Sequence, residues 1–413
     1  MMDSYLLSPN CRFVPKVASM IIEWKKFPTT ILVVHKFCDG KVIESLKEFV
    51  LFILQKWQVT VLLEKESMDE LKKDSQFFSS IARYFVDEDE PIHESNQHAA
   101  DNPSETGSCP PARTGGVSQT SFIRVFRDAV VNSVELIVCL GGDGTLLHIA
   151  SMFQRVSPPV IAFRLGSLGF LTPFPFSSFP SHMQRAMEGS PNCLLRTRLC
   201  CQIVRRGTNV CTLPNSSSIN SASRCGSPDT EYHFLNELVV DRGLSPSPCD
   251  LMVKVNGRTV THFEGDGLIV STATGSTAYS MATGASMLHP WVPAFLLTPI
   301  NSFALSSRAI VLPLNLHIEI SIASRARCPI AHFSFDGRSR ASNLIQKGDS
   351  IIVTVSRYPI PCLCSEDQAA DWFCSLNNLL NWNFRYRKGS GNVPSDNPDV
   401  PETDAPSNSC LSP

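Results

Sequence analysis

The sequence has no marked excess of charge of either sign. Its 413 residues include 36 Lys and Arg against 38 Asp and Glu, which gives a formal net charge of −2. Proteins that bind nucleic acids or anionic membranes usually carry a clear basic excess. The near-balance of charge therefore predicts a small-molecule partner, with neither a nucleic acid nor a membrane among the partners.

Long hydrophobic runs are also missing. The longest apolar stretches, such as residues 292–300, contain prolines and fall well short of the roughly 20 residues of a membrane-spanning helix. The first twenty residues contain Asp3, two prolines and no continuous apolar stretch, unlike a secretory signal. The 15 cysteines lack the paired spacing of zinc sites, which favours reduced thiols. We therefore expect a cytoplasmic protein.

What is present is the composition of an ordinary globular protein, with 43% hydrophobic and 18% charged residues. A chain of this length exceeds what one hydrophobic core usually organises, so two domains are expected. Neither G-x-x-x-x-G-K-[ST] nor G-x-G-x-x-G occurs, which excludes the two usual nucleotide-loop motifs. A phosphate-binding loop in this chain must be of another type.

The first half alternates strand-like and helix-like segments. Apolar runs at 29–35 and 59–64 flank residues 41–57, whose apolar positions recur at helical spacing. This βαβ order predicts a Rossmann-like α/β domain with a parallel sheet over residues 29–190, after an N-terminal extension (1–28). A polar insertion is expected at about 88–120. The predicted elements that follow are a helix near 122–132, a strand at 134–140, a helix from Thr145 and a strand at 160–163.

Beyond residue 190 the pattern changes to short strands, which predicts a β-rich, β-sandwich domain over residues 191–387. Asn256-Gly257 lies between two strand-like runs and supplies the positive φ angles of a two-residue hairpin turn. We expect a helix near 276–284 and a C-terminal helix at about 371–382 that packs back on the molecule. The polar tail, residues 388–413, is expected to be disordered.

The first candidate site is Gly141-Gly142-Asp143-Gly144, between a buried-type strand and an apolar-periodic helix. Parallel α/β sheets bind ligands at the carboxyl ends of their strands. Glycines let backbone amides approach a phosphate, and the helix from Thr145 adds the positive end of its dipole. The structural alternative, equally open, is a tight turn in which Asp143 only caps the helix.

The second candidate site is Glu264-Gly265-Asp266-Gly267, followed by a strand and by residues 272–279 at the start of a helix. Hydroxyls at a helix start, here those of Thr274, Ser276 and Thr277, are suited to ribose or phosphate oxygens. The alternative is a well-capped helix after a glycine turn, and we favour the functional interpretation.

Three further segments are ambiguous. Asn236-Glu237 places an amide beside a carboxylate at the start of a strand, a pair suited to ribose hydroxyls or an adenine edge. Taken alone, this pair fits an ordinary loop with solvated charges better. We interpret His289 and the segment SFDGR (334–338) as structural.

Taken together and in order, five segments resemble the NAD kinase family, with the closest likeness to the animal cytosolic type. They are GGDGTLL (141–147), LGSLGFLTPF (165–174), LNELVVDRG (235–243), EGDGLIVSTATGSTAYSMATGASMLHP (264–290) and SFDGR (334–338). The resemblance implies the fold shared by NAD kinases and diacylglycerol kinases: an α/β domain and a β-rich domain with the active site between them. It also implies a homodimer or homotetramer.

The resemblance implies that Asp143 is the catalytic carboxylate, which takes the proton from the 2'-hydroxyl of the adenosine ribose of NAD as it attacks the γ-phosphate of ATP. Such a base contributes about 10²- to 10⁴-fold to the rate, and positioning contributes most of the remainder. Mg²⁺ or another divalent metal would accompany ATP, and no residue is assigned as a metal ligand. The nucleotide-binding residues by resemblance are Gly142, Gly144, Thr145, Phe170, Asn236, Glu237, Asp266, Thr274, Ser276, Thr277, Ala278 and Tyr279.

One segment departs from the family pattern. Where animal members usually carry cysteine, proline, histidine and serine, this chain has Asn301-Ser302-Phe303-Ala304. The change bears on the preference for NAD or NADH and leaves Asp143 intact. Two alternatives stay open: a lipid kinase of the diacylglycerol or sphingosine type, which shares a GGDGT loop, and a dinucleotide-binding regulator that has lost catalysis.

Overall fold

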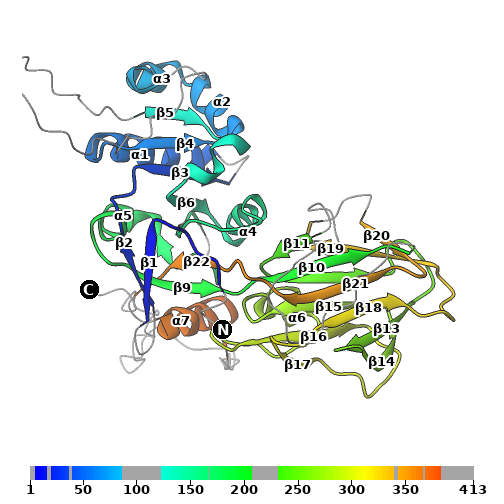
Figure 1. The fold of residues 1–413 in the computed structure, drawn as a ribbon. Helices are drawn as coiled ribbons and strands as arrows, with labels where there is room; N and C mark the ends of the chain where they lie inside the picture. Colours follow the sequence, from blue (N-terminus) through cyan, green and yellow to red (C-terminus); the bar gives the residue numbers. More distant parts are fainter. Residues whose placement is uncertain are drawn as a thin grey trace, which may run out of the picture.

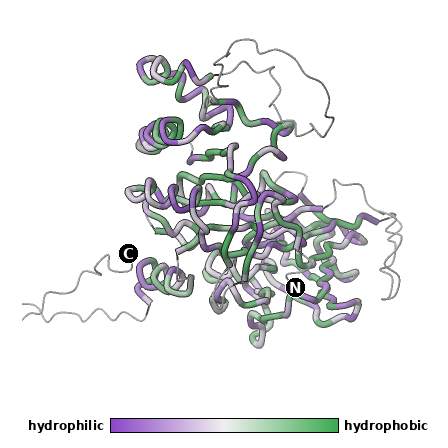
Figure 2. Tube along the Cα trace, turned by 60° about the vertical axis from the view of Figure 1, so that its left-hand side comes forward, coloured by the Kyte–Doolittle hydropathy of each residue, from purple (hydrophilic) through white to green (hydrophobic). Residues whose placement is uncertain are grey.

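The computed structural model describes residues 5–15, 20–36, 40–85, 122–166, 168–206, 231–338, 343–365 and 368–382. These residues form two lobes, an α/β lobe and a β-rich lobe (Figure 1). Figure 2 shows hydrophobic and hydrophilic residues interleaved along the trace of the described residues. The expected insertion (88–120) and the expected disordered tail (388–413) lie outside the described residues.

The α/β lobe is built on a parallel sheet, as the alternating pattern predicted. Strand β3 pairs in parallel with β4 and β6, β6 with β7, and β4 with β5. These strands are β3 (Thr30–His35), β4 (Thr60–Leu63), β5 (Phe122–Val125), β6 (Leu136–Gly141) and β7 (Val160–Arg164); the short β8 (Phe174–Pro175) pairs with β7. Every residue of β3 and β6 is buried, which a sheet covered on both faces requires.

Helices cover both faces of this sheet. The helices are α1 (Gly40–Lys56), α2 (Lys65–Lys73), α3 (Ser75–Ile81), α4 (Asp143–Met152) and α5 (Phe179–Glu188). Apolar residues of α1 and α5 share one core with Ile31 and Val33 of β3. Leu32 and Val34 point to the opposite face, where they pack with residues of α4. Alternate positions of one strand therefore supply two cores.

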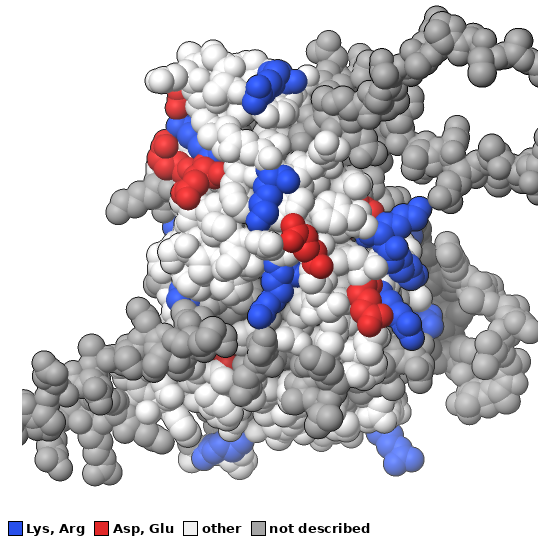
Figure 3. Space-filling view, turned by 90° about the vertical axis from the view of Figure 1, so that its left-hand side faces the viewer, with Lys and Arg blue, Asp and Glu red and all other residues white. Residues whose placement is uncertain are grey.

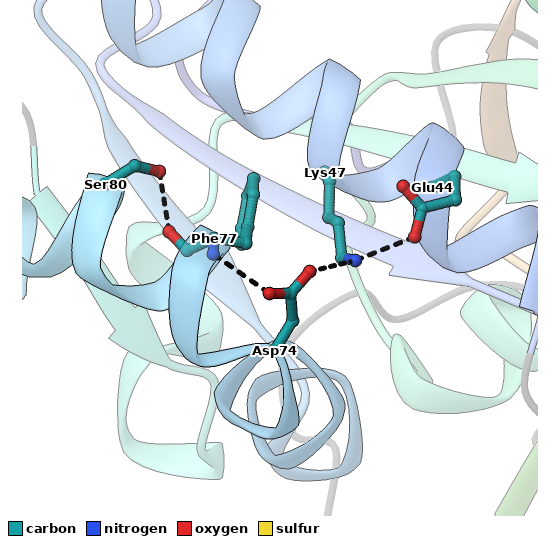
Figure 4. A network of polar contacts seen from close by, with 5 residues as sticks. All are labelled: Glu44, Lys47, Asp74, Phe77 and Ser80. Carbon is teal, nitrogen blue, oxygen red and sulfur yellow. Dashed lines mark hydrogen bonds and ion pairs between the residues drawn. The ribbon is translucent and has the colours of Figure 1, made fainter.

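At the outer edge of this lobe a polar network joins α1 to α3 through Asp74, which lies between α2 and α3 (Figure 4). The Asp74 carboxylate accepts a hydrogen bond from the Phe77 amide at 3.0 Å, which caps the start of α3. The same carboxylate lies 2.6 Å from Lys47 Nζ of α1, which also contacts Glu44 at 2.7 Å. Ser80 Oγ donates to the Phe77 carbonyl at 2.6 Å. Helix α3 is therefore held at its first turn to α1.

The helix predicted near 122–132 is absent, and that prediction is wrong. Residues 122–125 form β5, and residues 128–133 form a short 3₁₀ helix. Ile123 lies opposite Val61 of β4 and is fully buried, so pairing at the sheet edge overrides the local helical pattern.

Strand pairing in the α/β sheet crosses the expected boundaries at 28 and 190, which stay predictions. Strands β1 (Cys11–Pro15) and β2 (Met20–Trp24) form a hairpin that extends the α/β sheet by pairing with β9 (Asn192–Arg196). Strand β22 (Ile360–Leu363) pairs with β9 and β7 in the same sheet. Sheet membership depends on contacts across the chain, which local composition does not encode. Helix α7 (Gln368–Leu380) follows β22, where a C-terminal helix was expected.

The β-rich lobe consists of two six-stranded antiparallel sheets around one core. The first sheet contains β10 (Leu199–Val204), β11 (Glu231–Phe234), β13 (Cys249–Val255), β14 (Arg258–Gly265), β18 (Ile318–Ile322) and β21 (Ser350–Val355). The second contains β12 (Glu237–Asp241), β15 (Gly267–Thr272), β16 (Ala294–Ile300), β17 (Ile310–Pro313), β19 (Ile330–Phe335) and β20 (Leu344–Gln346). The predicted turn between β13 and β14 is confirmed: Asn256 has φ 49° and Gly257 φ 78°.

The two lobes meet at the end of α4. The fully buried Arg198, between β9 and β10, donates to the carbonyls of Ala150 at 3.2 Å and of Phe153 and Arg155 at 2.6 Å. Gln154 pairs with the backbone of His233 through its side-chain oxygen and nitrogen, at 2.9 and 3.1 Å. These contacts satisfy carbonyls that a helix end leaves open, and they attach α4 to the β-rich lobe.

Charges of both signs lie on the surface. On the face shown in Figure 3, Lys and Arg side chains alternate with Asp and Glu, and wide uncharged areas separate them. Among the described residues, no helix combines the length and the apolar run that a bilayer crossing requires.

Candidate active site

The Gly141–Gly144 segment forms the turn between β6 and α4. Gly142 is the N-cap of α4, and the helix begins at Asp143, two residues earlier than expected. A Cβ added to Gly142 or Gly144 would meet nothing within 4 Å, whereas one at Gly141 would lie 2.3 Å from Thr145 Oγ1. Gly141 is therefore required by packing. Gly142 and Gly144 leave open space at the positive end of the α4 dipole, where an anion binds favourably.

Asp143 joins this turn to the loop that follows β7. Its carboxylate accepts hydrogen bonds from the amides of Phe170 at 3.0 Å and Leu171 at 3.1 Å. Thr172 Oγ1 lies at 3.5 Å. The approach requires a glycine at 169, because a Cβ there would lie 2.0 Å from Asp143 Oδ1.

Burial raises the pKa of Asp143 above the usual aspartate value, while the Leu171 and Phe170 amides and the charge of Arg196 act in the opposite direction. The net upward shift makes this carboxylate a better proton acceptor than a surface aspartate. Oδ2 accepts only the Phe170 amide among the described residues, so it retains acceptor capacity for a further proton.

Arg196, to which the sequence analysis assigned no role, belongs to this group of residues. It is buried in β9, and its Nη2 donates to the Phe170 carbonyl at 3.2 Å. One side chain therefore fixes the loop backbone and places a positive charge near Asp143. The only signal in the sequence was an arginine within the otherwise apolar strand segment LLR (194–196).

The backbone around Asn236-Glu237 is organised by Asp336, in the turn after β19. The buried carboxylate of Asp336 accepts the amides of Leu235 at 2.9 Å, Asn236 at 2.7 Å and Glu237 at 3.1 Å. The structural interpretation of SFDGR is consistent with this role. Asp336 shapes the loop from which Asn236 and Glu237 project.

Asn236 and Glu237 themselves carry buried polar atoms without partners. Asn236 Oδ1 and Glu237 Oε2 have no hydrogen-bond partner among the described residues. Burial and the nearby Asp336 raise the pKa of Glu237 to about 7, partly offset by the Tyr279 amide. Unpaired buried groups of this kind cost free energy unless a ligand or water satisfies them.

Residues 272–279 pack directly against this pair. Thr272 Oγ1 donates to the Leu235 carbonyl at 2.6 Å, and the Thr272 amide donates to the Asn236 carbonyl at 2.9 Å. A Cβ on Gly275 would lie 2.2 Å from the Asn236 carbonyl oxygen. The structure thus brings residues 272–279 of the second candidate site together with Asn236-Glu237.

The side chains of this segment differ in their availability. Ser276 is fully buried, and its hydroxyl donates to the Ala273 carbonyl and accepts the Leu288 amide at 2.7 Å each. The Ser276 hydroxyl is therefore used within the protein, and nucleotide binding by Ser276 stays a prediction. Thr277 Oγ1 donates to the Thr274 carbonyl at 3.2 Å within the 3₁₀ turn Thr274–Thr277. Ala278 separates this turn from α6 (Tyr279–Ala282). The Tyr279 side chain is 43% exposed.

Asp266 lies apart from this group within one chain. It precedes β15, whereas Thr274 follows the end of that strand, so six strand residues, about 20 Å, separate them. Its carboxylate pairs with Arg242 Nε at 2.7 Å and accepts from Asn301 Nδ2 at 2.9 Å. Within one chain Asp266 and residues 274–279 therefore lie at opposite ends of β15, and nucleotide binding by Asp266 stays a prediction. Asn301, the first residue of the divergent segment, contacts Asp266 directly.

Helix α7 closes the side of the loop that carries Phe170. The Trp372 ring lies 6.4 Å from the Phe170 ring and 5.3 Å from the His289 ring. Ser375 Oγ donates to the Gly169 carbonyl at 3.4 Å. Phe170, Arg196, His289 and Trp372 line one small cavity beside this helix.

These features define a two-domain nucleotide-binding protein of the α/β class, with a glycine turn and a half-buried carboxylate at the end of a parallel strand. Family models match both lobes: the ATP-NAD kinase N-terminal domain over residues 31–190 and the ATP-NAD kinase C-terminal domain over residues 235–363. The chain belongs to the ATP-NAD kinase family.

Similar proteins agree with this assignment. The chain is 33% identical to "NAD kinase 2, chloroplastic" of Arabidopsis thaliana over 90% of its length, which covers 32% of that protein. It is 39% identical to "NAD(+) kinase" of Saccharomyces cerevisiae over 62% of its length and 47% of the relative. The chain thus spans about a third to a half of these curated relatives.

Among solved structures, yeast NADH kinase complexed with NADH is 28% identical, with a TM-score of 0.71 over 94% of this chain and 98% of the other. An Archaeoglobus fulgidus NAD kinase in complex with ATP is 19% identical and shares the fold, with a TM-score of 0.52 over 85% of this chain and 99% of the other.

Proposed function

We propose that this chain is an NAD kinase, which transfers the γ-phosphate of ATP to the 2'-hydroxyl of the adenosine ribose of NAD and yields NADP and ADP. The observation that carries the proposal is the half-buried Asp143 at the start of α4, beside glycines that leave room for phosphates. Family membership and relatives named as NAD kinases support the choice of acceptor.

The phosphate groups of ATP bind at the open backbone of Gly142 and Gly144 and at the amino end of α4, beside Thr145. ATP enters as its complex with Mg²⁺ or another divalent metal, which belongs to the substrate. As the ribose oxygen attacks the γ-phosphorus, Asp143 Oδ2 accepts the hydroxyl proton and the bond to the β-phosphate oxygen breaks.

NAD binds through Asn236, Glu237 and the neighbouring turn that begins at Thr274. The unpaired atoms of Asn236 and Glu237 accept hydrogen bonds from ribose hydroxyls, and Thr274, Thr277, Ala278 and Tyr279 line the same turn. Phe170 supplies an apolar wall. These roles rest on the packing of residues 272–279 against Asn236 and on the family resemblance.

The substitution Asp143→Asn tests the proposal. It preserves the side-chain shape and removes the base, so kcat for NADP formation should fall by about 10²-fold or more while the Kd for NAD changes by less than about tenfold. Asp128→Asn, at an exposed aspartate of the same lobe, is the control. A large loss of NAD affinity would make Asp143 a binding residue instead.

A coupled assay of the native chain also separates the two alternatives. Turnover with diacylglycerol or sphingosine and none with NAD would establish a lipid kinase. NAD binding without NADP formation would establish a non-catalytic regulator.

We further propose a homodimer or homotetramer. The exposed edge strand β17 carries Ile310 at 42% and Val311 at 51% exposure, and the nearby chain exposes Phe303 and Leu305 at 65% and 93%. Apolar side chains gathered in this way are typical of protein interfaces. Light scattering coupled to size-exclusion chromatography measures the mass, and a monomer at all concentrations would refute the proposal.

We also propose residence in the cytoplasm. Seven cysteines among the described residues are free thiols, which suits a reducing compartment: Cys11, Cys139, Cys200, Cys201, Cys249, Cys328 and Cys362. Relatives include proteins named as chloroplastic and mitochondrial, so fractionation of cells that express the tagged full chain is the deciding measurement.

A further inference from the structure

Three metal-ligating side chains gather on the outer face of the first sheet of the β-rich lobe, outside the residues assigned to ATP and NAD. Cys200 of β10 lies directly opposite His233 of β11, and Glu231 is two residues before His233 on the same strand. Because side chains alternate along a strand, the three share one face. Their neighbours Leu199, Cys201 and Phe234 point into the core.

The spacing of the three groups suits a metal ion. One sulfur, one carboxylate oxygen and one ring nitrogen all lie within 4.8 Å of one another. Ligands of tetrahedral zinc, at about 2.3 Å for sulfur and about 2.0–2.2 Å for nitrogen and oxygen, lie about 3.3–3.6 Å apart. An inward movement of the three ligand atoms by about 1 Å is therefore sufficient to bring them to the spacing of zinc ligands. Glu231 is exposed, so its side chain can rotate to make it.

An unpaired polar atom points independently to a ligand. His233 is 7% exposed, and its Nδ1 has no hydrogen-bond partner among the described residues. Burial, aided by the charges of Arg198 and Arg155, lowers the pKa of His233 to about 4, so the ring is neutral near pH 7. A neutral imidazole is the form that ligates metals.

The neighbouring interactions leave room for coordination. Gln202 Nε2 donates to Glu231 Oε1 at 2.5 Å, and the second carboxylate oxygen remains for an ion. Arg198 is the charged group that acts on both Cys200 and His233. Its guanidinium nitrogens donate to backbone carbonyls. Burial and the charge of Glu231 raise the pKa of Cys200 to about 12, against a smaller lowering by Arg198, so the thiol is protonated near pH 7. Coordination therefore displaces one thiol proton into solution.

We propose that Cys200, Glu231 and His233 form a zinc-binding site with a fourth position open to water. A set of one sulfur, one nitrogen and one oxygen ligand suits zinc and disfavours Mg²⁺ and Ca²⁺, which take oxygen ligands. The ion links the edge strand β11 to β10. It also strengthens the contact between the lobes, because the His233 backbone pairs with Gln154 beyond α4.

Cobalt(II) is the probe, because a thiolate bound to tetrahedral Co²⁺ gives a charge-transfer band and intense visible bands. The full chain, first stripped with a chelator, is titrated with Co²⁺ and then with Zn²⁺. We expect the bands to saturate at one equivalent and to vanish when Zn²⁺ displaces Co²⁺.

Variants assign the bands to this cluster. Cys200→Ser should abolish the charge-transfer band, and Glu231→Gln, at an exposed position that is safe for folding, should weaken Co²⁺ affinity at least tenfold. Cys328→Ser removes a different thiol from the same lobe and should change nothing. This control is needed because the chain has 15 cysteines.

A second readout is thermal stability. Stoichiometric Zn²⁺ should raise the melting temperature of the native chain and of Cys328→Ser, and should leave that of Cys200→Ser unchanged. The proposal is overturned if the native chain gives no band at stoichiometric Co²⁺. It is equally overturned if Cys200→Ser or Glu231→Gln binds Co²⁺ as the native chain does. Neither readout depends on kinase activity.

Discussion

At the scale of single residues, the site depends on carboxylates whose surroundings differ. Asp143 and Asp336 both accept backbone amides, but Asp336 meets three of them and lies deeper. Glu237 keeps an unpaired oxygen. These local environments support the roles that we propose: proton transfer for Asp143, loop support for Asp336 and ligand binding for Glu237.

Glu237 makes stability depend on pH. Its pKa rises from 4.5 to about 7 on folding, so between these values the native state binds a proton that the unfolded state has released. The free energy of unfolding should therefore fall as pH rises from about 4.5 to 7, by up to about 1.4 kcal/mol per pH unit from this group. Glu237→Gln should flatten this slope.

Urea unfolding at pH 5, 6, 7 and 8 measures the effect, without added nucleotide. Glu44→Gln, at an exposed position in α1, is the control and should keep the native slope. Parallel pH curves for the native chain and Glu237→Gln would contradict the assignment.

Gly169 provides a second prediction at this scale. A methyl group there would lie 2.0 Å from Asp143 Oδ1, so Gly169→Ala must displace either the loop or the carboxylate. Misplacement of a reacting group by about 1 Å costs roughly 100-fold in rate, so kcat should fall by about that factor. Gly40→Ala, where the methyl group meets open space, should have little effect on steady-state kinetics.

At the scale of elements, α4 and α7 hold the site from opposite directions. Helix α4 starts at Asp143 and ends at carbonyls bound by Arg198 of the chain segment between the lobes. Helix α7 returns from β22 to cover Phe170 and the Gly169 carbonyl. The loop that contacts Asp143 is therefore held by an element more than 200 residues later in the sequence.

Removing the α7 ring tests this support. Trp372→Ala deletes contacts with Phe170 and His289, and aromatic pairs of this kind contribute about 0.5–1.5 kcal/mol. We expect kcat/KM for NAD to fall by about 3- to 10-fold, since a factor of ten corresponds to about 1.4 kcal/mol. Leu380→Ala, at a 37% exposed position late in the same helix, is the control. Equal kinetics of the two variants would show that α7 does not support the loop.

At the scale of the whole molecule, two lobes with separate cores are joined through a buried cation. Arg198→Met would leave several helix-end carbonyls without a partner, and each unsatisfied buried group costs about 1–3 kcal/mol. The free energy of unfolding should therefore drop by about 3–5 kcal/mol. Arg155→Met removes an exposed guanidinium close by and should cost far less. Urea unfolding followed by circular dichroism compares the two variants, and a similar midpoint for both would contradict the role of Arg198.

The sequence by itself determined the elements that have a strong local pattern, and the motif. The 3.6-residue spacing of α1, the apolar strands β3 and β6, the Asn256-Gly257 turn and the glycine loop are local patterns, because each follows from the chemistry of neighbouring residues. The family resemblance then supplied the acceptor, which no local pattern contained.

Only the tertiary structure decided which distant residues meet. It placed Arg196 and Gly169 against Asp143, set Asp336 beneath Asn236 and separated Asp266 from Thr274. It also assigned β1, β2, β9 and β22 to the α/β sheet. These outcomes depend on hydrogen bonds and burial between segments far apart in the chain, whose partners are selected by the packing of the whole fold.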